Sequence, residues 1–167
     1  MTSDAAGPQQ DRTAADPDVG MIEAAYAAYA RGDIGQVVAR LHPQVEWIEP
    51  EEFPGGGRRT GPAAVAEYLT ASLAGWAELH SSATVYRQGD TIVARHHVQG
   101  RLASGAAHEI TVADVFTVRD GLVMRMQAYA DPADAERAHR AHQRDARERE
   151  GRQREGREHA GPATAGS

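Results

Sequence analysis

The N-terminal part of the chain carries apolar residues at helical spacing. Ile22, Tyr26 and Tyr29 fall at positions i, i+4 and i+7, which form one stripe of an amphipathic helix. This helix is predicted to begin near Val19 and to end at Gly32, a residue typical of helix ends. Similar patterns predict two further helices, over residues 34–41 and 62–75.

The pattern of the remaining segments is the alternation of apolar and polar residues that is typical of strands. Five strands are predicted in this way, over residues 45–49, 78–88, 91–103, 107–119 and 122–130. Residues 51–60 are predicted to form a loop, because three consecutive glycines lie within it. The order is helix, helix, strand, helix and then a four-stranded antiparallel meander. Helices grouped on one side of an antiparallel sheet define an α+β domain.

The two ends of the chain differ from the middle. Residues 1–18 are small and polar and are predicted to be disordered, which leaves residues 19–134 as the domain. Residues 135–167 are predicted to form a charged helical extension and a disordered tail. From residue 138 to residue 157 there is no apolar stripe, so a helix there has no face to bury. A fraying, solvated tail and an arm for nucleic acid or a protein partner are both consistent with this composition.

Composition narrows the class of protein. The chain has 167 residues, no cysteine and a net charge of −6, which argues against nucleic acid as a partner. No segment approaches the roughly 18 apolar residues of a membrane helix, so no membrane association is expected. The N-terminus has neither a basic start nor an apolar run, so we expect a cytoplasmic protein.

Asp114 is the most informative single residue. It lies in an alternating segment, residues 110–118, in which its own face is otherwise apolar. Aspartate is depleted in strands, and an ionised carboxylate that is buried without a partner is costly. Two readings are open. Asp114 is either an ordinary paired or solvated strand residue, or a carboxyl group that lines a pocket, where burial would raise its pKa.

Other residues are weaker candidates. His96 shares a strand face with apolar residues, and is read either as an acid or base in a pocket or as a core histidine. Trp47 is read either as the floor of a pocket or as core packing. The histidines show neither His-x-His nor His-Glu-x-x-His spacing, so no metal centre is expected. The acidic run from Glu49 to Glu52 is read as solvated.

The chain resembles the SnoaL-like polyketide cyclases and ketosteroid-isomerase relatives of the nuclear transport factor 2-like superfamily. The resemblance covers residues 19–134. It rests on the order of five segments, residues 29–33, 45–50, 59–65, 114–123 and 129–132, of which the longest reads Asp-Val-Phe-Thr-Val-Arg-Asp-Gly-Leu-Val. It implies a cone-shaped, curved antiparallel sheet packed on three N-terminal helices, and a homodimer formed through the outer face of the sheet.

The resemblance also implies roles for particular residues. Asp114 matches the aspartate that donates a hydrogen bond to the developing oxyanion in ketosteroid isomerases. Glu49, followed by Pro50, matches the Asp-Pro whose carboxylate moves the proton. The oxyanion-hole tyrosine of those enzymes falls at Ala25, and its neighbour Tyr26 is expected to point about 100° away on an ideal helix.

Together these expectations describe a small-molecule enzyme without a cofactor. It is expected to be an isomerase or cyclase that transfers a proton on a hydrophobic, polyketide- or steroid-like carbonyl compound. Glu49 and Asp114 are the expected catalytic pair, with His96 as an auxiliary. The residues expected to contact the substrate are Tyr26, Tyr29, Trp47, Phe116 and Met126. A non-catalytic ligand-binding protein is the alternative, and a protein-interaction domain with a filled interior is a third reading.

Overall fold

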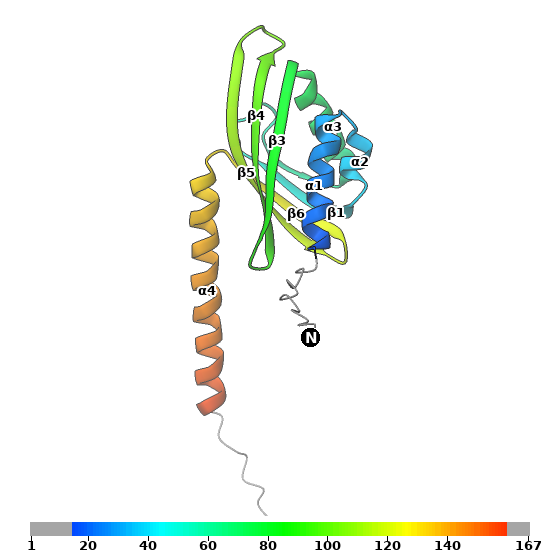
Figure 1. Cartoon of the computed structure of the whole chain (residues 1–167). Coiled ribbons are helices and arrows are strands. Elements are labelled where there is room, and N and C mark those ends of the chain that lie inside the picture. The colour runs from blue at the N-terminus through cyan, green and yellow to red at the C-terminus, as the bar shows by residue number, and fades with distance from the viewer. Residues whose placement is uncertain (1–14, 160–167) are drawn as a thin grey trace, which may run out of the picture.

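A curled six-stranded sheet wraps round three helices, and a fourth helix projects from its outer side (Figure 1). This computed structural model describes residues 15–159, so the expectations for residues 1–14 and 160–167 lie outside it. The elements in chain order are α1 (Pro17–Ala30), α2 (Ile34–Val38), β1 (Leu41–Glu49), β2 (Gly57–Thr60), α3 (Pro62–Ala74), β3 (Trp76–Gln88), β4 (Thr91–Leu102), β5 (Ala107–Arg119), β6 (Leu122–Tyr129) and α4 (Pro132–His159). The fold is the α+β architecture that the sequence predicts.

The order of strands in the sheet is β2-β1-β6-β5-β4-β3. Strands β3 to β6 form the expected antiparallel meander, and β1 joins it by pairing parallel to β6. Asp114 lies near the centre of the sheet, opposite Ala94 of β4 and Ala128 of β6. Small neighbours on both sides leave space above the Asp114 side chain for residues from the helices.

The structure differs from the sequence prediction at several element boundaries and in one additional strand. Strand β1 begins at Leu41 rather than residue 45, so Pro43 lies inside a strand. Residues 57–60 form β2, an edge strand paired with β1, where a loop was expected. An edge strand needs hydrogen bonds on one side only, so a segment with glycine and two arginines can form one. Helix α1 begins at Pro17, because the Asp16 carboxylate accepts hydrogen bonds from the first turn.

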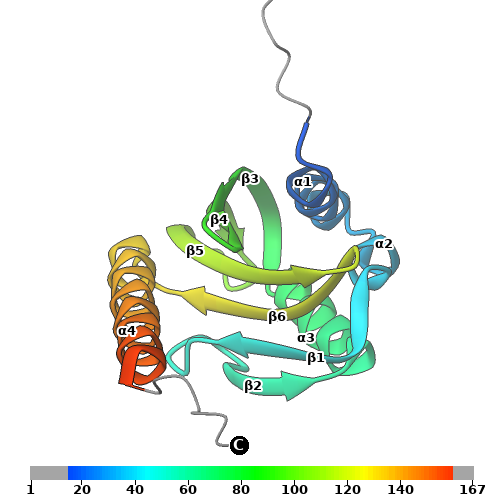
Figure 2. The same cartoon turned by 90° about the horizontal axis from the view of Figure 1, so that it is seen from below.

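The core lies between the concave face of the sheet and the helices (Figure 2). Its largest fully buried side chains are Ile22, Val45, Val65, Ile92 and Met126. Helix α1 is also fixed at its N-terminus, since Arg87 of β3 forms ion pairs with Asp16 at 2.5 Å and with Asp18 at 3.1 Å. This contact holds α1 across the concave face of the sheet.

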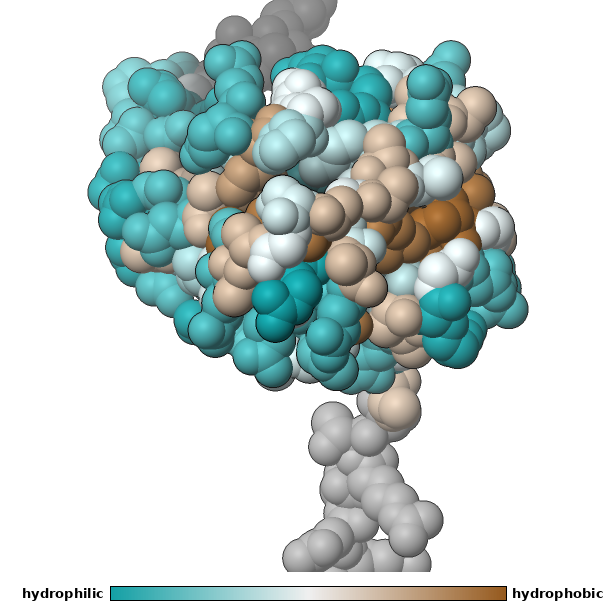
Figure 3. Space-filling model, turned by 90° about the horizontal axis from the view of Figure 1, so that it is seen from above, coloured by the Kyte–Doolittle hydropathy of each residue, from teal (hydrophilic) through white to brown (hydrophobic). Residues whose placement is uncertain are grey.

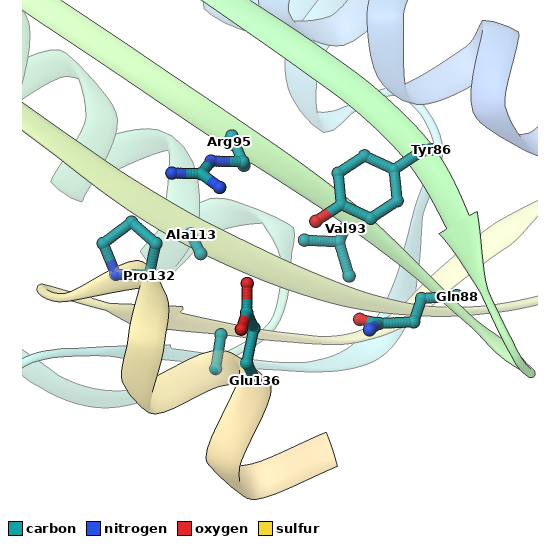
Figure 4. A pocket seen from close by; sticks show the side chains of 8 residues that line it. Tyr86, Gln88, Val93, Arg95, Ala113, Pro132 and Glu136 are labelled. Atoms are coloured by element: carbon teal, nitrogen blue, oxygen red, sulfur yellow. The ribbon is translucent and has the colours of Figure 1, made fainter. Parts of the chain in front are cut away.

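Helix α4 contacts the outer face of the sheet through its first turns only (Figure 4). Ala135 packs near Val93 and Ala113, and all three are buried. A hollow of about 10 Å³ remains under this contact. The helix then continues to His159 and leaves the domain (Figure 1). The sequence analysis predicted a charged helical extension from residue 135 and left open a fraying tail, and the structure has one continuous helix as far as His159.

The surface of the domain is mostly polar. Seen from the end opposite the tip of α4, apolar residues show between polar ones rather than as one continuous patch (Figure 3). No helix within residues 15–159 is long and apolar enough to cross a membrane.

Candidate functional site

Asp114 points into the interior of the domain, where its exposed fraction is 8%. Its Oδ2 atom accepts a hydrogen bond from the hydroxyl group of Tyr26 on α1. The resemblance placed the tyrosine of this region at Ala25, whereas the structure brings Tyr26 to Asp114. Tyr26 lies on the same inward stripe of α1 as the buried Ile22, and its ring reaches across to β5.

His96 lies beside this pair. It forms no ion pair with Asp114, because its imidazole is not protonated at neutral pH. Its Nδ1 atom is 3.9 Å from Oδ2 of Asp114, and its Nε2 atom is 2.7 Å from the Ser81 hydroxyl. The Tyr26 ring packs edge-on against the imidazole, with centroids 4.8 Å apart. Burial lowers the pKa of His96 to about 4, with a smaller effect from His97. The imidazole is therefore neutral at neutral pH.

Glu49, at the end of β1, is the second carboxyl group of this region and is half-buried. Its Oε1 atom accepts a hydrogen bond of 2.7 Å from the Trp47 indole. Burial raises the pKa of Glu49, and the Trp47 hydrogen bond, the positive charge of Arg59 and the Tyr68 hydroxyl act in the opposite direction. A carboxylate with a raised pKa is a stronger base than one in water.

Glu49 affects the titration of Asp114. The pKa of Asp114 is raised to about 7, mainly by burial and in part by the negative charge of Glu49, while the Tyr26 hydrogen bond acts in the opposite direction. The Glu49 charge also contributes to the raised pKa values of Tyr26 and Tyr29. These groups thus lie in one poorly solvated region, where charges act over longer distances than in water. Asp114 is close to half-protonated at neutral pH, and Glu49 is near enough for its charge to affect that protonation.

The apolar residues expected to contact a substrate surround this region and fill it. Trp47, Phe116 and Met126 are buried in the core, and the Trp47 and Phe116 rings are 6.3 Å apart. Tyr29 lies farther out, with its ring 6.0 Å from that of His96 and its hydroxyl 3.4 Å from that of Ser72.

Two hollows lie away from the region of Asp114, Glu49 and His96. The small one lies under α4, on the outer face of the sheet. A second, of about 310 Å³, is lined by His42, Gln44, Glu46, Thr117, Arg119, Met124 and Arg125. Neither is lined by Asp114, Glu49 or His96. Asp114 and His96 are enclosed by the surrounding side chains, whereas Glu49 is half-buried.

Two residues of this region were not expected from the sequence. Ser81 lies on the inner face of β3, a position that strand alternation offers but does not distinguish. Tyr68 was expected from the sequence either to place a hydroxyl group at the mouth of a pocket or to pack in the core. Arg59 was missed because β2 was predicted to be a loop, and only the strand fixes which of two adjacent arginines faces inward.

Metal ligands are not grouped in the described chain. Within residues 15–159, no three side chains of histidine, aspartate or glutamate lie close enough together to hold an ion. The polar groups that this region does bring together are carboxyl, hydroxyl and imidazole groups.

Comparison with known proteins identifies the fold. The chain resembles an NTF2-like protein of unknown function from Burkholderia pseudomallei, with 20% identity over 74% of this chain and 97% of that one and a TM-score of 0.64. It resembles TerC, co-crystallised with polyporic acid, with 24% identity, coverage of 75% and 99% and a TM-score of 0.60. It also resembles a presumed polyketide cyclase from Xanthomonas campestris, with 24% identity, coverage of 70% and 92% and a TM-score of 0.57.

No curated protein matches the chain significantly. At these identities the structural matches establish the shared fold, and the family follows from the sequence itself. The model of the SnoaL-like domain matches residues 22–126, which is more than half of the chain. The protein is therefore a member of the SnoaL-like domain family.

Proposed function

We propose that the protein is an isomerase or cyclase that transfers a proton on a hydrophobic carbonyl compound of polyketide or steroid type. The observation that carries the proposal is the pair of carboxyl groups with raised pKa values, the buried Asp114 and the half-buried Glu49, beside an interior lined by aromatic residues. A proton transfer beside a carbonyl group needs a base for the carbon and a donor for the oxygen. The pair contains one group for each role.

Glu49 is proposed as the base. In its ionised form it removes a proton from the carbon next to the carbonyl, and the C–H electrons move onto the carbonyl oxygen as an enolate. Asp114, in its protonated form, donates a hydrogen bond to that oxygen while Tyr26 holds the carboxyl group in place. Glu49 then returns the proton to another carbon, or the enolate attacks a second carbonyl and closes a ring.

The proposal is tested with glutamine at position 49. In deuterium oxide, the wild-type protein is expected to catalyse deuterium uptake at the carbon beside the carbonyl of a substrate drawn from cyclic ketones that carry a hydrogen on that carbon. Glu49→Gln should slow this uptake by about 10² to 10⁴-fold, the usual effect of a general base. Asp114→Asn should also lose most of the activity. Nuclear magnetic resonance measures the uptake directly.

Glu46→Gln is the matched control. Glu46 lies on the same strand as Glu49, but its side chain is 42% exposed and pairs with Arg58. Its uptake rate should equal that of the wild type. Equal rates in wild type and Glu49→Gln would exclude Glu49 as the base.

A non-catalytic ligand-binding protein is the second candidate. It is favoured by the closed interior, which Trp47, Phe116 and Met126 fill. If a compound binds to the wild type and exchanges no deuterium, this second function is the correct one. If no compound binds, the third interpretation applies, in which the protein is a protein-interaction domain.

The proposal includes a homodimer formed through the outer face of the sheet. A row of neighbouring residues on this face, Ile48, Gln127, Val115 and Val93, is largely apolar. Val93 is covered by the start of α4, while Ile48 and Val115 are half-buried. A cytoplasmic location is likewise proposed.

A further inference from the structure

Arg59 is a charged residue of the domain, and one nitrogen atom of its guanidinium group has no hydrogen-bond partner among the described residues. Its guanidinium group lies over the Tyr68 ring, 3.9 Å from the centroid, and its Nη2 atom donates to the Gly55 carbonyl. Its Nη1 atom is buried, and it makes no hydrogen bond to any residue in the range 15–159. It is the single buried side-chain nitrogen or oxygen atom of that range without a partner.

An unpaired donor of this kind is unfavourable. A buried polar group without a hydrogen bond costs free energy, and the cost is larger when the group is charged. Nearly all buried polar atoms in native proteins are paired, so an exception calls for an explanation. A ligand atom that accepts the hydrogen bond is one such explanation.

The surroundings of Arg59 identify what it would bind. Arg59 forms no ion pair with Glu49 within the described residues, yet its charge lowers the Glu49 pKa. The guanidinium group is therefore near the proposed base without being neutralised by it. An arginine donor pairs best with a negatively charged oxygen, such as a carboxylate or an ionised enol.

The loop between β1 and β2 closes this end of the interior. The Gly55 backbone lies against the Tyr68 ring, since a Cβ atom placed on Gly55 would be 3.6 Å from it. Nη2 of Arg59 holds the carbonyl of the same residue. Residues 51–56 thus lie over the group that has the unpaired donor, and a ligand that reaches Arg59 from this side has to displace them.

We infer that Arg59 is an anchoring residue for a negatively charged oxygen of the substrate, at the Glu49 end of the site. This inference rests on the proposed function and narrows the substrate to carbonyl compounds that also carry an acidic group. The acidic group would accept a hydrogen bond from Nη1 while the reacting carbon faces Glu49. The anchoring oxygen is distinct from the carbonyl oxygen that Asp114 would stabilise.

The test compares two probes that differ by one charge and one methyl group. 2-Hydroxy-1,4-naphthoquinone is an acidic enol that is ionised at neutral pH, and its O-methyl ether is neutral. Isothermal titration gives the dissociation constant of each probe. Arg59→Gln should weaken binding of the ionised probe by about tenfold to a hundredfold and that of the ether by much less. Arg59→Lys should retain part of the preference for the ionised probe.

Arg58→Gln is the matched control for these variants. Arg58 is adjacent in β2, faces the opposite side, and pairs with Glu46 while its side chain is 62% exposed. It should bind both probes as the wild type does. Melting temperatures of all variants show whether each is folded. If Arg59→Gln does not fold, the preference of Arg59→Lys relative to wild type decides the question.

The outcomes separate this inference from the proposed reaction. An equal loss for both probes in Arg59→Gln, an unchanged affinity, or binding of neither probe to the wild type would overturn the anchor. Loss of the ionised probe alone supports it, even if Glu49→Gln leaves deuterium uptake unchanged and the proposed reaction fails. Conversely, base catalysis by Glu49 together with an equal loss for both probes would retain the reaction and reject the anchor.

Discussion

Asp114 and His96 respond to burial in opposite directions. Asp114 has an ordinary pKa of 3.8 and a pKa of about 7 in the folded protein. Between these values the folded state binds more protons than the unfolded state, so the free energy of unfolding falls as pH rises. His96 changes from 6.5 to about 4, and its contribution to stability rises with pH over that range.

The difference between wild type and Asp114→Asn isolates the Asp114 contribution. Asparagine does not ionise, whereas the His96 contribution is common to both proteins. The melting temperature of Asp114→Asn should therefore rise relative to that of the wild type between about pH 4 and pH 7. The difference corresponds to a few kcal/mol at most, by the relation between pKa and free energy. Scanning calorimetry across this pH range measures it, and a constant difference would mean that Asp114 is not buried as a titrating acid.

Single residues also show where sequence reasoning ends. The position of Asp114 on an inward face follows from strand alternation, because a pleated strand has a strict period of two residues. The Tyr26 contact does not follow from helical spacing, because it depends on how the sheet curves towards α1. Arg59 could be placed only after β2 was known, and the glycine-rich sequence of residues 55–57 carries no strand signal.

The elements of the domain form for different reasons. The helices and the long strands have amphipathic patterns that predict them from sequence. Strand β2 forms because β1 offers it an unpaired edge, which is a tertiary effect. Helix α4 is a mixed case. Its first turns have apolar contacts with the sheet, whereas the rest of the helix is polar on all sides.

The attachment of α4 is testable at its one well-buried residue. Ala135 is 6% exposed under the sheet contact. Ala135→Asp should lower the free energy of unfolding by about 1–3 kcal/mol, because it buries a carboxylate without a partner. Ala146→Asp, on the exposed part of the same helix, should change it by less than about 0.5 kcal/mol. Urea unfolding measures both, and equal effects would mean that α4 is not attached through Ala135.

The whole molecule presents two different sheet faces. The inner face meets the helices, and the outer face carries the apolar row that the proposed dimer would bury. Val115→Asp places a charge within this row and should convert a wild-type dimer to a monomer. Ala71→Asp, on an exposed position of α3, is the control and should stay dimeric. Light scattering after size-exclusion chromatography gives the mass, and a monomeric wild type would reject this interface.

A ligand of the interior would compete with the side chains that already fill it. If the proposed ligand binds beside Asp114 and Glu49, it needs volume that side chains occupy in the free protein. The observed affinity is then the intrinsic affinity multiplied by the small fraction of molecules that are open. Substitutions that loosen the packing round Trp47 or Phe116 would raise that fraction and lower the melting temperature together. Tight binding and high stability are therefore opposing demands on the same few residues.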